Sequence, residues 1–198
     1  MLLDAYADGS WAERVLTLHQ AMGADLRAHD ETGQTLLMKA AARDDLALVQ
    51  ALMAANVPLD STDIHGWSAL EHAVQGQATT AALALIAGGA RERIDHHENS
   101  TLQYAVNLVA DSQVIAALVR AGADVNRRSL DGLTVLMEAI DAGNPVASIE
   151  ALFAVPGLDL TLRDPRGEDA LTHARAGADP AVVALIESRL GNTVAPEH

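Results

Sequence analysis

Histidine and carboxylate side chains stand next to one another in the segment Asp95-His96-His97-Glu98. Imidazole nitrogens and carboxylate oxygens are ligands that Zn²⁺ and Ni²⁺ take in proteins. A further imidazole, that of His65, belongs to an earlier turn and would stand about 8 to 10 Å away. Because adjacent residues of one turn do not readily converge on one ion, we interpret these side chains as solvated turn residues. A metal-binding or hydrolytic protein that uses its His-rich turns is the alternative hypothesis.

No catalytic signature accompanies these histidines. The sequence contains no Gly-rich phosphate loop, no His-Glu-x-x-His and no Gly-x-Ser-x-Gly. It also has no cysteine, which excludes disulfides, thiolate metal sites and cysteine nucleophiles. We therefore predict a protein that is not an enzyme and needs no cofactor.

Aromatic residues at predicted surface positions favour the binding of a protein partner. Trp67 directly follows the turn residue Gly66 and is expected to point outward, and Trp and Tyr are enriched among interface hot spots. Packing of Trp67 against the adjacent hairpin is the alternative. We expect His72 and His173 to be exposed on their helices. The predicted protein-binding residues are Lys39, Ile64, His65, Trp67, His72, His97, Tyr104 and Glu138.

A sequence repeat determines which elements would position these residues. Five hexapeptides match one pattern, with Thr, Ser or Asp first, Leu third and Ala last, at spacings of 33, 32, 34 and 35 residues. A turn segment such as Asp-Glu-Thr-Gly precedes each hexapeptide, and a second apolar helical segment follows it. A motif that recurs at a nearly fixed period indicates stacked repeats, each composed of turn, helix, turn and helix. The hexapeptides are TLLMKA (35–40), SALEHA (68–73), STLQYA (100–105), TVLMEA (134–139) and DALTHA (169–174).

This pattern resembles the ankyrin repeat, whose mark is Thr-Pro-Leu-His-x-Ala at a period of about 33 residues. The resemblance implies an all-α solenoid of antiparallel helix pairs joined by β-turn or hairpin loops, which binds partners through its concave face and hairpin tips. The Pro and the His of the family motif are absent from every unit. We therefore expect the hydrogen bonding that this His makes between units to be missing. Glu98 also stands where the other turns have Gly.

The resemblance implies one domain over residues 1–191 and a flexible tail over 192–198. Ser10 and Glu13 form a capping box in an atypical first unit. At the other end, Asp179 and Pro180 start the last helix and Gly191 is expected to stop it. The predicted units are approximately 1–32, 33–65, 66–97, 98–131, 132–166 and 167–191.

Charge restricts the class of partner. The formal net charge is −14 and the isoelectric point is near 4.7, so binding to nucleic acid is disfavoured, because a phosphate backbone needs a basic face. A protein with a basic patch is a better match. Late turns carry a basic fringe of Arg127, Arg128, Arg163 and Arg166. No signal peptide or membrane-spanning run is evident, so we expect a cytoplasmic protein without a membrane partner, monomeric when free.

Taken together, these features predict a non-enzymatic protein–protein interaction module. It would act as an inhibitor or immunity-type protein that masks a basic active site, or as an adaptor that joins two proteins. A third hypothesis makes the chain a substrate: the segment around Asn126 resembles the ankyrin segment that a eukaryotic oxygenase hydroxylates. The same segment is also ordinary repeat consensus, which is the simpler interpretation.

Overall fold

The computed structural model describes residues 17, 23, 25–95, 99–108, 111–177 and 179–192. Within these ranges the regular structure consists of α-helices and isolated β-bridges, without strands. The chain divides into two compact units, Met1–Arg91 and Glu92–His198, and each unit is described by itself. The predicted single domain over 1–191 remains a prediction.

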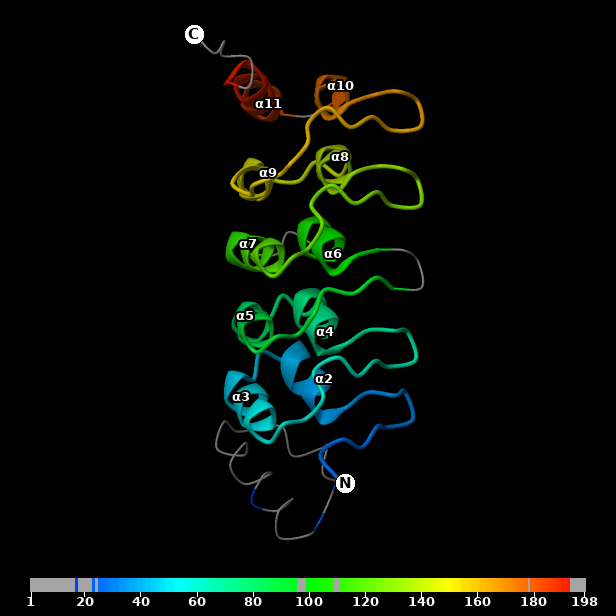
Figure 1. Cartoon of the computed structure of the whole chain (residues 1–198), viewed down its shortest axis with the longest axis vertical. Coiled ribbons are helices and arrows are strands. Elements are labelled where there is room, and N and C mark those ends of the chain that lie inside the picture. The colour runs from blue at the N-terminus through cyan, green and yellow to red at the C-terminus, as the bar shows by residue number, and fades with distance from the viewer. Residues whose placement is uncertain are drawn as a thin grey trace. The chain divides into compact units, whose positions relative to one another are not determined.

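The described residues of the first unit hold two helix pairs. In each pair a first helix and a second helix are joined by a short loop, and each stacks on its counterpart in the next pair, α2 on α4 and α3 on α5 (Figure 1). The hairpin loops project from the side of the first helices. The helices are α2 (Leu36–Ala42), α3 (Leu46–Ala54), α4 (Ala69–Gln75) and α5 (Thr79–Ala87).

In its described part, the second unit repeats this arrangement in three helix pairs. The first helices α6, α8 and α10 stack in order, and so do the second helices α7, α9 and α11. The last helix extends through Gly191 to Asn192, so the expectation that Gly191 ends it was wrong. The helices are α6 (Thr101–Asn107), α7 (Ser112–Arg120), α8 (Val135–Asp141), α9 (Val146–Phe153), α10 (Ala170–Gly177) and α11 (Pro180–Asn192).

Side-chain caps start the first helices where the sequence predicted them. Ser68 precedes α4 in an extended conformation and its hydroxyl accepts from the backbone N–H of Leu70. The Glu71 carboxylate in turn accepts from the Ser68 N–H at 2.7 Å. This reciprocal pair satisfies two donors that a helix end leaves open. Thr35 and Ser100 form reciprocal pairs of the same kind with Met38 and Gln103, and the Thr134 hydroxyl accepts from the backbone N–H of Met137.

The repeated Leu and Ala positions form the core. Leu70 and Ala73 have no exposed surface, and neither do Leu102 and Ala105. The alanines keep neighbouring first helices close, because a larger side chain would separate them. Leu171, in α10, is half-buried.

Glycines with positive φ close the hairpin turns. Gly33 has a φ of 76°, which costs an L-residue energy and costs glycine little. A Cβ added at Gly33 would also come within 3.1 Å of the backbone of Asp63 and Ile64 in the next hairpin. The turn therefore needs glycine both for its backbone angle and for the close stacking of hairpins. Gly66, Gly132 and Gly167 share the positive φ.

Candidate protein-binding site

A column of side chains links most of the first helices to their own hairpin turns. In each of five repeats a helix residue lies nine positions after a turn residue. In four of these repeats the two side chains face each other across the base of the hairpin. Four of the eight predicted protein-binding side chains, Lys39, His72, Tyr104 and Glu138, belong to this column. The pairs are Asp30 with Lys39, Asp63 with His72, Asp95 with Tyr104, Ser129 with Glu138, and Asp164 with His173.

The turn aspartates shape the hairpin with one oxygen and face the helix with the other. Asp63 Oδ1 accepts from the backbone N–H of His65 at 2.8 Å and of Trp67 at 3.0 Å. Burial raises the pKa of the Asp63 carboxyl, but these backbone donors and His72 outweigh burial and hold the pKa below its ordinary value. The ionised carboxylate is therefore part of the folded hairpin.

His72 takes the second oxygen of Asp63. Its Nε2 lies 2.9 Å from Asp63 Oδ2, and its side chain is only 12% exposed. The expectation that His72 is exposed was wrong, because the turn carboxylate holds the imidazole against the base of the hairpin. Trp67 packs edge-on against His72 at 5.7 Å between ring centroids, and His65 lies 6.3 Å from Trp67. The structure thus brings His65, Trp67 and His72 together in the first unit, with the indole half-buried.

Lys39 and Tyr104 make the same kind of link with different chemistry. The Lys39 ammonium forms an ion pair with Asp30, and this interaction contributes most to a pKa of Asp30 well below its usual range. In the second unit, the Tyr104 hydroxyl donates to Asp95 Oδ2 at 2.5 Å. Both helix side chains are half-buried. They hold the hairpins and present only part of their surface to a partner.

The repeat that contains Ser129 and Glu138 departs from this scheme. Its turn residue is Ser129, whose hydroxyl is buried with no hydrogen-bond partner among the described residues. Glu138 instead accepts from the Gln103 side chain of the preceding repeat, at 3.1 and 3.3 Å. Gln103 occupies the position of the family's His. The expectation that hydrogen bonding between repeats is missing at this position was therefore wrong for Gln103 and Glu138, because the Gln103 amide replaces the imidazole.

His173 is buried and faces two carboxylates. Its Nδ1 lies 2.9 Å from Asp141 Oδ1 on the preceding first helix, α8. Its Nε2 points to Asp164 Oδ2 but stays 3.6 Å away. Only 4% of the side chain is exposed, so the expectation of an exposed His173 was also wrong. Packing between α8 and α10 encloses the ring.

Large apolar side chains are exposed at hairpin tips. Ile64 is 64% exposed in the first unit, and Leu130 is 74% exposed in the second. Water-exposed apolar side chains of this size are the type that interfaces bury. Ile64 was among the protein-binding residues predicted from the sequence, and Leu130 was not. The available signal was the position of Leu130 in its turn, which corresponds to that of Ile64.

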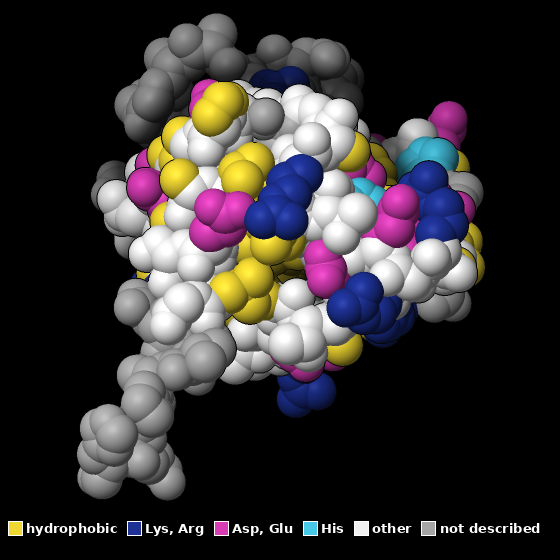
Figure 2. Space-filling view, turned by 90° about the horizontal axis from the view of Figure 1, so that it is seen from above, with side chains coloured by type: hydrophobic (Ala, Val, Ile, Leu, Met, Phe, Trp, Pro, Cys, Tyr) yellow, Lys and Arg dark blue, Asp and Glu magenta, His cyan; other side chains and the backbone are white. Residues whose placement is uncertain are grey.

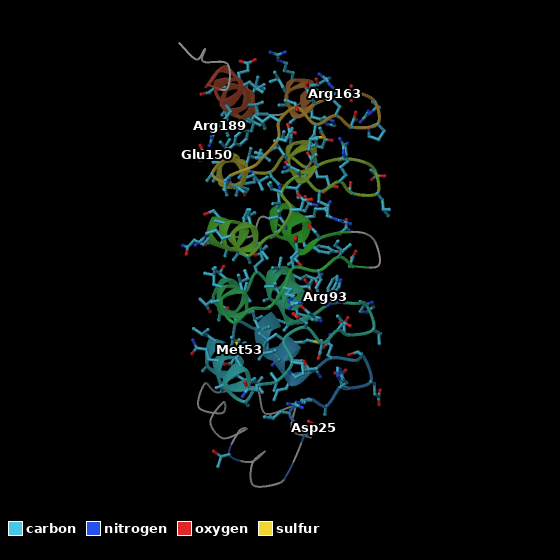
Figure 3. All side chains as sticks on the ribbon, viewed as in Figure 1. Asp25, Met53, Arg93, Glu150, Arg163 and Arg189 are labelled. Carbon is cyan, nitrogen blue, oxygen red and sulfur yellow. The ribbon has the colours of Figure 1, made fainter. Side chains whose placement is uncertain are left out.

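The predicted basic fringe is largely engaged within the hairpins. The Arg128 guanidinium donates to the carbonyls of Gly132 and Arg163. Arg163 donates to the carbonyl of Gly167 and pairs with Asp169, and it lies on the hairpin side of α10, apart from Arg189 beside α11 (Figure 3). Figure 2 shows basic and acidic side chains mixed on one face, without a patch of a single sign. These arginines brace turns as well as carrying charge.

Comparison with known proteins decides the family. A family model described as ankyrin repeats (3 copies) matches residues 5–98. Human Rabankyrin-5 is 26% identical over 184 residues, which cover 85% of this chain. The protein is an ankyrin repeat protein. The chain spans 16% of the length of Rabankyrin-5.

A solved structure matches the ankyrin chain over most of its length. It is a complex of a predatory endopeptidase from Bdellovibrio bacteriovorus with an immunity protein. The matched chain shares 26% identity, and the TM-score is 0.73. The match covers 91% of this chain and 96% of that chain. The predicted all-α ankyrin solenoid of helix pairs is confirmed.

Some predictions for this ankyrin repeat protein lie outside the described residues. His97, with the neighbouring His96 and Glu98, falls in 96–98, and the capping box of Ser10 and Glu13 falls in the N-terminal segment. None of the helices in the described ranges has the length and apolar character that a membrane crossing needs.

Proposed function

We propose that this ankyrin repeat protein is an inhibitor of the immunity type, which binds an enzyme through its hairpin tips. The observation that carries this proposal is the contrast between exposed apolar tips and tethered helix side chains. Ile64 and Leu130 expose most of their surface, whereas His72 and Tyr104 are held by turn aspartates. Rigid hairpins with apolar tips bind at low entropic cost, because little has to be ordered on association.

The likeness to the endopeptidase–immunity complex favours inhibition over other outputs. That similarity extends over nearly the whole of both chains, whereas the similarity to Rabankyrin-5 concerns a small part of a much longer protein. In an interaction module of this kind the binding itself would be the output, with no reaction carried out by the repeats. An adaptor that joins two proteins is the second candidate, supported by the Rabankyrin-5 similarity.

Charge supports a partner with a basic patch. The chain carries a net charge of −14, which would steer a basic surface toward it and raise the association rate. We place Ile64, His65 and Trp67 at the centre of the contact in the first unit. Lys39 and His72 would form its rim within that unit and hold the hairpins in place. Tyr104 and Glu138 of the second unit, and His97, would add further contacts to the partner.

The test begins with affinity capture from an extract of the native cells. Wild type is compared with Ile64→Asp and Leu130→Asp, which place a charge at each tip, and with the control Gln50→Asp on the exposed face of α3. We expect wild type and the control to retain the same basic protein, and each tip variant to bind it at least about tenfold more weakly. Equal retention by all four proteins would contradict a contact at the tips.

A second measurement separates the two candidate functions. The captured protein is assayed for hydrolase activity with and without one equivalent of the ankyrin repeat protein. Loss of activity at stoichiometric addition supports an inhibitor. Unchanged activity, together with a second protein bound at the same time, would support the adaptor instead.

A further inference from the structure

Three metal-ligating side chains converge at the hairpin of the last repeat. Asp164 and Glu168 come from the turn and His173 from α10, and one ligand atom of each lies within 4.8 Å of the others. This is the one such group in the described part of the chain. It is distinct from the His-rich segment Asp95-His96-His97-Glu98.

His173 presents an unpartnered nitrogen to this group. Its Nε2 is buried and has no hydrogen-bond partner among the described residues. The two oxygens of Asp141 lie 2.9 and 3.0 Å from Nδ1, which assigns the proton of the neutral ring to Nδ1. The Nε2 lone pair is then directed toward Asp164 Oδ2. Leaving such a group without a partner costs free energy, and an electrophile between nitrogen and oxygen would remove this cost.

The spacing suits two ligands of one metal ion. Nε2 and Oδ2 are 3.6 Å apart, which is too long for a hydrogen bond. Two ligands at the usual bond lengths of a tetrahedral zinc ion stand about 3.4 Å apart. The carboxylate behind Nδ1 also matches the arrangement in which an acid orients a metal-binding imidazole.

One cation already approaches the carboxylates. The Arg166 Nε lies 3.2 Å from Asp164 Oδ2 and 3.4 Å from Glu168 Oε2. The Arg166 side chain is 71% exposed, so it can swing into solvent at little cost. A metal ion would therefore compete with a loosely held guanidinium.

The repeat that contains Asp63 and His72 provides an internal comparison. Asp63 and His72 correspond to Asp164 and His173, but Trp67 stands at the position of Glu168. There, Nε2 is 2.9 Å from the turn carboxylate and is already hydrogen-bonded. That repeat thus lacks both the third ligand and the open nitrogen.

We propose that His173, Asp164 and Glu168 bind one divalent transition-metal ion, with zinc as the best fit. The site would fasten the last hairpin to α10, while Asp141 orients the imidazole from α8. Three protein ligands leave a fourth position for water or for a side chain of a partner. This inference does not depend on the proposed inhibitory function.

The test is a zinc titration of the full chain by calorimetry, after chelator treatment and without a polyhistidine tag. All proteins carry His96→Ala and His97→Ala, so that the other histidine pair cannot contribute. We expect one Zn²⁺ per chain, with binding abolished by His173→Gln and unchanged by the matched control His72→Gln. We also expect binding about 10- to 100-fold weaker in Asp141→Asn, and about fivefold tighter in Arg166→Ala, where a competing positive charge is removed.

Two further measurements keep the outcome clear if His173→Gln fails to fold. Glu168→Gln changes a half-exposed side chain, so it should keep the circular dichroism spectrum of the parent while binding zinc at least about tenfold more weakly. Nitrogen NMR of the parent should show the His173 Nε2 resonance shift on zinc addition. A folded parent that takes up no zinc, or equal binding by the parent and a folded His173→Gln, would overturn the proposal. A His173 ring protonated on both nitrogens and unresponsive to zinc would do the same.

Discussion

His72 and His173 occupy the same position of their repeats, nine residues after a turn aspartate, and they meet different partners. His72 turns its Nε2 to Asp63 at 2.9 Å. His173 is held through Nδ1 by Asp141, and its Nε2 stops 3.6 Å from Asp164. The residue that corresponds to Asp141 in the repeat before His72 is Ala42, which has no acceptor on its side chain. The preceding repeat therefore decides whether the histidine serves its own hairpin or its neighbour.

The largest effect in this comparison is expected from Asp63→Ala. The substitution removes the acceptor of two backbone N–H groups and of His72 in a buried turn. We expect it to lower the free energy of unfolding by about 3 kcal/mol, since hydrogen bonds to charged groups contribute about 1.5 to 3 kcal/mol each and water can replace some of them. Urea denaturation measures this loss. A change below about 1 kcal/mol would contradict the role of this carboxylate.

The comparison can also be reversed by grafting. Ala42→Asp with Trp67→Glu gives the repeat that contains His72 the acid behind Nδ1 and the third ligand found in the last repeat. We expect the double variant to bind a second Zn²⁺ about tenfold more tightly than Trp67→Glu alone. Calorimetric titration measures the stoichiometry of each. Equal zinc binding by the single and double variants would show that an acid at position 42 does not orient His72.

Asp141→Ala should make the orientation of His173 resemble that of His72. Without the carboxylate on Nδ1, His173 is free to move its Nε2 into hydrogen-bond distance of Asp164, as His72 does with Asp63. One hydrogen bond is exchanged for another, so the loss of unfolding free energy should stay near about 1 kcal/mol. A crystal structure of the variant checks the ring position. A ring that stays in place would mean that packing, and not Asp141, orients it.

Acid sensitivity should follow the turn aspartates. The pKa of Asp63 lies below its ordinary value of 3.8, where backbone donors outweigh burial. A carboxyl with a lowered folded pKa contributes stability that is present above its unfolded pKa and is lost as the pH falls through the folded pKa. We expect the unfolding free energy to decrease below about pH 4, and to decrease less steeply in Asp63→Asn. Denaturation curves at several pH values measure both slopes, and parallel slopes would refute the assignment.

The smallest effect is expected from Ser129→Ala. The Ser129 hydroxyl is buried without a hydrogen-bond partner among the described residues, so its removal leaves no group newly unsatisfied. The unfolding free energy should change by less than about 0.5 kcal/mol or rise slightly. Thermal denaturation of Ser129→Ala and Asp63→Ala side by side compares their losses of stability directly. A loss comparable to that of Asp63→Ala would mean that Ser129 shapes its turn as the aspartates do.

Much of the fold could be predicted from local sequence. Thr35 and Ser68 cap helices, and Gly33 and Gly66 adopt positive φ, because caps and turns depend on the chemistry of a few consecutive residues. The buried Leu and Ala of each repeat followed from their period in the same way. Ile64 was also found from its place at a turn tip.

The tertiary structure alone decided the partners of the helix side chains. The types of His72 and His173 are identical, and their sequence surroundings gave no reason to separate them or to bury them. Their burial and orientation depend on a turn nine residues away and on the preceding repeat. Hydrogen bonds between such segments arise only when the repeats are stacked. The sequence by itself therefore determined the repeat and its helix pairs, because these rest on local chemistry, whereas stacking selected the acceptor that each histidine meets.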